Sequence, residues 1–276
     1  MTKLRIGCAQ LRTSVEIEAN IDHALALIRE AAGKGARFIA TPEMTNLLDI
    51  RPGKARPKIV AESDDKTLAA LRALADELGI WLLIGSIAVM VEGEERLANR
   101  SFLIAPDGAI RARYDKIHMF DVEVGDGQSY RESRSYRPGE RAVLAETEFG
   151  KLGMTICYDV RFPHLYRKLA QAGAEILTIP AAFTRVTGQA HWHTLVRARA
   201  IETGSFVLAP AQGGKHEDGR ETFGHSLIVS PWGDVLAEKA DDEPGVIVAD
   251  IDLDAVAKAR GRIPSLGNDQ VITFEG

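Results

Sequence analysis

The segment that decides the fold is GMTICYDVRFPHLYRKLAQAGAEILTIPAAFT, residues 153–184. It opens with the end of an apolar strand, places Cys157 directly after that strand, and puts Pro163 where the first turn of a helix would lie. The helix is expected to stop near Gly173, and the apolar run 174–180 then predicts a second strand. A strand, a helix and another strand in close succession indicate an α/β layered fold.

The same alternation continues on both sides of this segment. Helical spacing of apolar residues predicts helices at 16–32, 65–78 and 190–203, and apolar runs predict strands at 4–11, 37–43, 80–89, 100–106, 205–211, 225–231 and 245–251. Consecutive strands with no helix between them, such as 80–89 and 100–106, indicate antiparallel pairs within a mixed sheet. Because no linker or low-complexity stretch interrupts the pattern, we interpret residues 1–276 as one domain.

The bulk composition is that of an ordinary globular protein. Of the 276 residues, 45% are hydrophobic and 26% are charged, and the formal net charge is −5. This charge argues against nucleic acid as a partner, since nucleic-acid binding usually requires a basic face. The two cysteines, Cys8 and Cys157, suit a reducing cytosol better than a disulfide framework. The sequence has no apolar run of about 20 residues, so we expect a cytoplasmic protein that neither spans nor binds a membrane.

Three reactive or charged residues each follow a predicted strand. Glu43 comes after RFIATP, Lys116 after AIRARY and Cys157 after KLGMTI. Ligands bind beyond the carboxyl ends of strands in open α/β sheets, so these three side chains can meet at one rim. A carboxylate can take the proton of a thiol, and an ammonium group can stabilise both the thiolate and a substrate oxyanion. The set suits amide hydrolysis, with the backbone N–H of Tyr158 as a second oxyanion donor.

Each of these residues also has a purely structural explanation. A glutamate after a strand is commonly a solvated loop end, and a cysteine that ends a buried strand is more often a core residue than a nucleophile. Cys8, which lies inside an apolar strand, fits the second description. The feature that favours catalysis is the sequence surrounding each residue.

These surroundings resemble the signature segments of the nitrilase superfamily, the carbon–nitrogen hydrolases. The matching segments are ATPEMTNLLD (40–49), YDKIHMFDV (114–122), 153–184, AHWHTLVRARAIETGSFVLAPAQGG (190–214) and GHSLIVSPWGDVLAE (224–238). The resemblance implies that Glu43 is the general base, Lys116 the oxyanion stabiliser and Cys157 the nucleophile. It also implies a four-layer α-β-β-α sandwich that needs no cofactor and assembles into homodimers or larger homo-oligomers.

The segment 117–140 has little apolar periodicity, and the same resemblance implies that it is a functional loop. A loop of this length in a compact domain is usually functional. Glu132 within it matches a second glutamate of the family, which holds the lysine and helps to orient the substrate. The alternative is a solvated carboxylate on a surface that also carries Arg131 and Arg134.

Three more residues are candidates for substrate binding. Arg161 lies four residues beyond Cys157, and a guanidinium group can hold a substrate carboxylate in a bidentate grip. Phe183 and Thr184 end the next strand and are expected to line the same pocket. An ordinary surface charge is the alternative role for Arg161.

The substrate indicated by the resemblance is a small anionic amide. KIHMFDV and CYDVRFP most resemble amidases that act on ω-amides of dicarboxylic acids, and 209–233 resembles the subgroup that hydrolyses deaminated glutathione to α-ketoglutarate and cysteinylglycine. That segment includes His216 and Arg220, which a plain polar loop explains equally well. The alternatives are α-ketoglutaramate, a nitrile, a carbamoyl group or an asparagine-like side chain.

Functions of other classes are less favoured. A catalytically silent scaffold that binds metabolites would be expected to have lost one member of the Glu43, Lys116 and Cys157 set. A redox sensor at Cys157 lacks an evident resolving cysteine. A metal site is not expected, because His191 and His193 are two residues apart and point to different faces of a helix, and no metal-binding motif accompanies them.

Overall fold

The protein is described by a computed structural model that covers residues 3–51, 53–124 and 129–275. The first of its two large sheets contains, in spatial order, β16 (Gly245–Asp252), β1 (Lys3–Gln10), β2 (Phe38–Ala40), β3 (Trp81–Val89), β4 (Ala98–Ile104) and β5 (Ile110–Asp115). The second contains β15 (Val235–Glu238), β14 (Leu227–Val229), β11 (Phe206–Ala209), β10 (Ile176–Thr178), β9 (Gly150–Met154) and β8 (Val143–Thr147).

The two sheets follow the same plan. β1, β2 and β3 are parallel in the first sheet, as β9, β10 and β11 are in the second. Antiparallel strands flank each parallel trio, including the predicted pair formed by β3 and β4. The expectation of mixed sheets is therefore confirmed.

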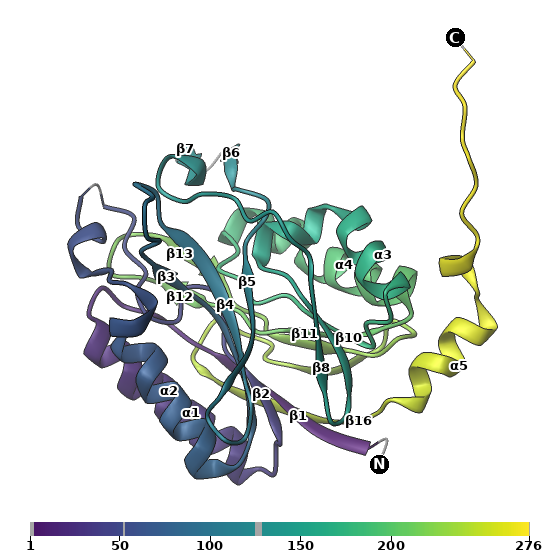
Figure 1. Cartoon of the computed structure of the whole chain (residues 1–276), viewed down its shortest axis with the longest axis horizontal. Coiled ribbons are helices and arrows are strands. Elements are labelled where there is room, and N and C mark those ends of the chain that lie inside the picture. Colours follow the sequence, from purple (N-terminus) through teal and green to yellow (C-terminus); the bar gives the residue numbers. More distant parts are fainter. Residues whose placement is uncertain (1–2, 52, 125–128, 276) are drawn as a thin grey trace.

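Helices form the outer layers of this sandwich (Figure 1). α1 (Ile17–Gly33) and α2 (Lys66–Leu78) cover the first sheet, and α3 (Pro163–Gln171) and α4 (Arg185–Thr203) cover the second. α5 (Asp254–Arg262) and the extended segment after it lead away from the body of the sandwich (Figure 1). This arrangement confirms the α-β-β-α architecture.

The alternation of side chains along a strand explains why two cores form. Phe38 and Ala40 of β2 belong to the core between the sheets, whereas Ile39 belongs to the core beneath α1 and α2. Successive residues of a strand point to opposite faces, so a strand that is buried on both faces must be apolar throughout. Truncating such a residue to alanine typically costs about 2–5 kcal/mol of stability.

Some boundaries differ from those predicted. α2 agrees closely with the prediction, because Asp65 caps its first turn by accepting a hydrogen bond from the Leu68 N–H and Gly79 ends it in the left-handed conformation. α4 begins at Arg185 rather than 190, since the polar residues of its first turn carry no apolar periodicity. β2 ends at Ala40, shortly before Pro42, which has no N–H to donate to a neighbouring strand.

Shorter elements complete the fold. They are the strand pairs β6 (Asp121–Glu123) with β7 (Ser129–Arg131) and β12 (Gly213–Lys215) with β13 (Glu221–Phe223), and the 3₁₀ turns η1 (Arg56–Lys58), η2 (Glu62–Asp64), η3 (Glu132–Arg134), η4 (Cys157–Arg161) and η5 (Ser265–Gly267). The β6–β7 pair lies within the segment predicted to be a long loop. Within the described ranges, no helix combines the length and the apolar character needed to cross a bilayer.

Candidate active site

Cys157 sits at a sharp turn between β9 and α3. It is the first residue of η4 and has a φ of 47°, a left-handed conformation that is uncommon for residues other than glycine. Its backbone N–H donates to the Pro180 carbonyl at 2.9 Å, so the loop after β10 holds the turn in place. Strained conformations of this kind persist where the surrounding structure fixes them, and they are frequent at active sites.

A glycine in β3 allows the loop that carries Glu43 to approach the loop after β10. A Cβ atom on Gly85 would lie 2.0 Å from the Thr41 carbonyl oxygen and 2.5 Å from Pro180 Cβ. The pairing of β3 with β4 shifts register between Ile84 and Ile87, around this glycine. The close approach therefore depends on a missing side chain.

Glu43 is buried, and hydrogen bonds fix both of its carboxylate oxygens. Oε1 accepts from Lys116 Nζ at 2.8 Å and from Asn99 Nδ2 at 2.9 Å, while Oε2 accepts from the Ala182 N–H at 2.9 Å. Gln212 Nε2 donates to the Glu43 carbonyl at 2.9 Å and holds the backbone. The carboxylate is thus oriented from both sheets.

Lys116 lies directly after β5 and contacts two carboxylates. Its Nζ atom is 2.8 Å from Glu43 Oε1 and 2.9 Å from Glu132 Oε2, and its side chain is only 2% exposed. Glu132 is held in turn by the Phe120 N–H, which donates to its Oε2 at 2.7 Å. The structure therefore brings Glu132 to the lysine, as the resemblance implied.

The charges of this cluster set the protonation of its members. Burial alone would raise the pKa of Glu43, but Lys116 outweighs it and holds that pKa below the ordinary value. Burial would lower the pKa of Lys116, but Glu132 and Glu43 raise it well above 10.5. Burial and the neighbouring Glu43 carboxylate raise the pKa of Cys157 well above 9.0. The free site thus holds a neutral thiol beside an ionised carboxylate and an ammonium group.

Asp159 connects the segment that carries Cys157 to the segment that carries Lys116. Its Oδ2 atom accepts from the Ile156 N–H at 2.8 Å and from the Tyr114 hydroxyl at 2.7 Å. Its Oδ1 atom accepts from the His118 N–H at 3.1 Å. One buried carboxylate therefore fixes the residues on either side of Lys116 relative to the turn at Cys157.

A cavity of about 530 Å³ opens onto these residues. Phe183, Thr184 and Tyr158 line it, as expected for residues that follow the strands of the second sheet. Arg220 also lines it, and its buried Nε atom has no hydrogen-bond partner within the described ranges. A guanidinium group on the wall of a cavity suits the carboxylate of a ligand.

Arg161 is not among the residues that line this cavity. Its guanidinium carbon lies 5.2 Å from the ring centre of Phe183 and 6.0 Å from that of Tyr158, so it packs behind two residues of the cavity wall. His216 is also outside the lining, and its ring is bonded to the Thr13 carbonyl and the Thr222 hydroxyl. His216 thus supports the loop around the site from behind.

Asn99 and Asp159 were not predicted as parts of the site, and Gln212 was indicated only as a member of the 209–233 segment that resembles one amidase subgroup. Asn99 lies in a strand, and Asp159 and Gln212 follow strands; apart from that resemblance, only their polarity within buried segments could have indicated a role. A polar side chain buried in an apolar stretch must find a partner, and here the partners are distant in sequence.

Comparisons with known proteins agree with this geometry. Residues 5–261 match the carbon–nitrogen hydrolase family. The deaminated glutathione amidase of Synechocystis sp. is 40% identical over 261 residues, which cover 93% of this chain and 94% of the relative. The omega-amidase NIT2 of Xenopus tropicalis is 37% identical, over 96% of this chain and 94% of the relative.

Solved structures show the same fold. The C. elegans NitFhit protein aligns over 98% of this chain with a TM-score of 0.90 and 32% identity, and this chain spans 66% of the NitFhit chain. A mutant amidase from Nesterenkonia sp. AN1, whose active-site cysteine carries the product of Michael addition of acrylamide, aligns over 95% of this chain and 98% of its own with a TM-score of 0.78 and 26% identity.

The chain belongs to the carbon–nitrogen hydrolase family. It is accordingly an enzyme that hydrolyses amides. The predicted family and fold are confirmed, whereas the roles of individual residues stay predictions that the geometry supports.

Proposed function

We propose that this enzyme hydrolyses a small anionic amide through an acyl-thioester on Cys157. The observation that carries the proposal is the position of Glu43, whose carboxylate bonds to Lys116 Nζ at 2.8 Å on one side and to the Ala182 N–H on the other, beside the thiol. A base, a cation and a nucleophile thereby meet at one end of a cavity.

The first half-reaction uses the protonation state described above. The sulfur of Cys157 attacks the amide carbonyl carbon as its proton moves to Glu43, and Lys116 and the Tyr158 N–H stabilise the oxyanion. When the tetrahedral intermediate collapses, Glu43 gives that proton to the departing nitrogen, which leaves as ammonia or an amine. The acyl group remains on the sulfur as a thioester.

The second half-reaction returns the enzyme to its starting state. A water molecule loses a proton to Glu43 and attacks the thioester carbon, and the same cation stabilises the second oxyanion. Collapse releases the carboxylic acid, and the proton returns from Glu43 to the sulfur. Glu132 keeps Lys116 charged and positioned through both steps, since its carboxylate contacts Nζ with both oxygens, at 3.0 and 2.9 Å.

Deaminated glutathione is the proposed substrate. The relatives that carry that name and the presence of Arg220 on the cavity wall both favour an acid with an amide at one end. α-Ketoglutaramate is the second candidate, because an omega-amidase is almost as similar in sequence. Arg161, Phe183 and Thr184 remain proposed substrate-binding residues, with Phe183 and Thr184 supported by their place in the cavity wall.

A parallel assay tests both the chemistry and the substrate. Deaminated glutathione, α-ketoglutaramate and a simple aliphatic nitrile are offered to the wild-type enzyme and to Cys157→Ala. We expect turnover by the wild type only, with the highest kcat/KM for deaminated glutathione. A tenfold preference for α-ketoglutaramate would overturn the substrate, and full activity of the variant would overturn the mechanism.

Three broader expectations belong to the same proposal. We propose that residues 1–276 form one domain, because residues from both halves of the chain share the core between the sheets. We also propose a homo-oligomer, as the family resemblance implies, and a cytoplasmic location, which suits the two free thiols of Cys8 and Cys157.

A further inference from the structure

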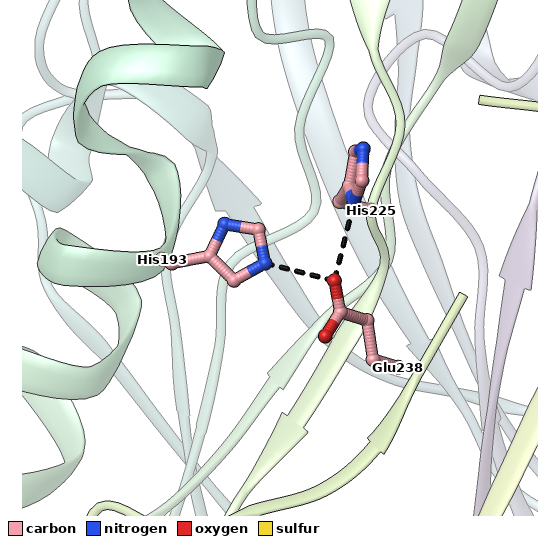
Figure 2. Close-up of side chains that lie close together, drawn as sticks. All are labelled: His193, His225 and Glu238. Carbon is pink, nitrogen blue, oxygen red and sulfur yellow. Dashed lines mark hydrogen bonds and ion pairs between the residues drawn. The ribbon is translucent and has the colours of Figure 1, made fainter. Parts of the chain in front are cut away.

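Three potential metal ligands meet at the surface of the second sheet (Figure 2). His193 lies on α4, His225 precedes β14, and Glu238 ends β15. Glu238 Oε1 is 2.9 Å from His193 Nε2 and 3.1 Å from His225 Nδ1. One ligand atom from each residue falls within 4.8 Å of the other two.

The chemistry of this set is that of a transition-metal site. Two imidazole nitrogens and one carboxylate oxygen are a common ligand set for Zn²⁺ sites that keep a position open. Ligand bonds of about 2.0–2.2 Å in a tetrahedral site place ligand atoms roughly 3.3–3.5 Å apart. The two separations from Glu238 are slightly shorter than this and all three lie within 4.8 Å, so small movements of these side chains would bring the ligand atoms to coordinating distances.

His225 is held in place by its surroundings. It has a φ of 53°, its carbonyl accepts a hydrogen bond from Trp192 Nε1 at 2.8 Å, and its ring stacks on Phe223 with the ring centres 4.2 Å apart. Trp192 is the neighbour of His193 on α4, and the rings of His193 and Phe223 are nearly perpendicular, with centres 6.0 Å apart. The two imidazoles are therefore fixed relative to each other, which lowers the entropy cost of binding an ion.

The cluster also remains accessible to solvent. The side chains of His193, His225 and Glu238 are 38%, 23% and 29% exposed. A divalent ion can reach them from solution, and a water molecule can fill a fourth coordination position. None of the three lines the active-site cavity, so the cluster is separate from the catalytic residues.

We propose that His193, His225 and Glu238 bind one divalent transition-metal ion, with Zn²⁺ as the best-fitting ion and water as the fourth ligand. This inference revises the sequence-based expectation of no metal. That expectation rested on the faces of a single helix, whereas these ligands come from three elements that only the fold brings together. Within the described ranges, no other group of three histidine, cysteine, aspartate or glutamate ligands shares this spacing.

A bound ion would join parts of the structure that otherwise meet through weak contacts. It would tie the middle of α4 to the end of β15, the edge strand of the second sheet. Exposed ion pairs contribute little to stability, typically about 0–1 kcal/mol, whereas an ion that binds only the folded state adds stability that grows with its concentration. The expected role is therefore structural.

Zinc titration by calorimetry tests the proposal directly. The protein is prepared without a histidine tag, treated with a chelator and studied as Cys157→Ala, so that the active-site thiol cannot take up zinc. We expect one Zn²⁺ per chain, and at least about tenfold weaker binding after either His193→Gln or Glu238→Gln is added. His164→Gln, which changes an exposed histidine outside the cluster, is the matched control and should bind as tightly as the parent.

Thermal unfolding supplies a readout that does not depend on activity or heat of binding. Zinc should raise the melting temperature of the parent and of the control, and should leave that of Glu238→Gln unchanged. Absence of saturable zinc uptake by the parent would overturn the proposal. Equal affinity in the parent and in both ligand variants would also overturn it, because the metal would then be bound elsewhere.

Discussion

The two six-stranded sheets share a plan but make different contributions to the active site. The first sheet supplies the charges, since Glu43 follows β2 and Lys116 follows β5. The second supplies Cys157, the proposed nucleophile, and the wall of the cavity, including Phe183. A similar arrangement of strands therefore does not produce two similar sites. The chemistry exists only where the carboxyl ends of strands from both sheets face each other.

The two cysteines also differ in the groups that surround them. Cys8 lies within β1 of the first sheet and Cys157 lies beyond β9 of the second, and both are buried. Burial raises the pKa of each thiol. Only Cys157 has a carboxylate and an ammonium group of the opposite sheet beside it. Burial alone leaves a thiol inert, and the charges contributed by the other sheet give it a base.

Replacing each cysteine separately with alanine tests this comparison and should give the largest effect. Cys157→Ala should lower kcat for the amide by at least about 10⁴-fold, because no other nucleophile can form the thioester. Cys8→Ala removes a core thiol and should retain nearly full kcat at a temperature where the variant is folded. Steady-state assays with circular dichroism as the folding control measure both. Comparable losses in the two variants would contradict the division of roles.

Asp159→Asn should weaken the contact between the segment of Cys157 and the segment of Lys116, while leaving Glu43, Lys116 and Cys157 in place. Its two oxygens accept from Ile156, Tyr114 and His118, and an amide can accept at one oxygen only. We expect the free energy of unfolding to fall by about 1.5–3 kcal/mol, the range for hydrogen bonds to charged groups. Urea denaturation measures it, with Asp22→Asn on the exposed face of α1 as the control. An unchanged urea midpoint would show that other contacts hold the segments of Cys157 and Lys116 together.

The arginines test which side chain binds the anionic end of the substrate, Arg220 between β12 and β13 or Arg161 in η4. We expect Arg220→Gln to raise KM for deaminated glutathione by about tenfold, or about 1.4 kcal/mol, with a small change in kcat. Arg161→Gln is the paired variant, and its effect should be smaller because that side chain packs behind the cavity wall. Initial-rate measurements with a neutral amide provide the control. A larger rise in KM from Arg161→Gln than from Arg220→Gln would show that Arg161 binds the substrate carboxylate, as predicted from the sequence.

The smallest expected effect is that of pH. Because the pKa of Glu43 lies below 4.5, its carboxylate stays ionised above that pH. We therefore expect kcat/KM to fall only below pH 4.5. The linked stability has the same sign: it is present above pH 4.5 and declines as Glu43 takes up a proton below it. Because the pKa of Cys157 lies well above 9.0, no gain in rate is expected between these limits. A pH–rate profile showing an acid limb near neutrality would contradict this assignment.

Much of this molecule could be predicted from its sequence. Apolar periodicity located α2 almost to the residue, and local motifs predicted Glu43, Lys116 and Cys157 as catalytic residues, because each carries its signal in the residues next to it. The contact of Asp159 with Tyr114 had no such signal, since it joins segments that lie apart in the chain. The same is true of the metal-ligand cluster, which could not be inferred from His193 alone.

The pairing of β1 with β16 has a consequence for synthesis on the ribosome. β1 is synthesised long before β16, yet all of its residues from Lys3 to Gln10 pair with Gly245–Asp252. Until β16 is made, one edge of β1 has unpaired N–H and carbonyl groups, the feature that promotes strand addition by other chains. That edge of β1 is therefore protected from such pairing only once β16 has joined the sheet.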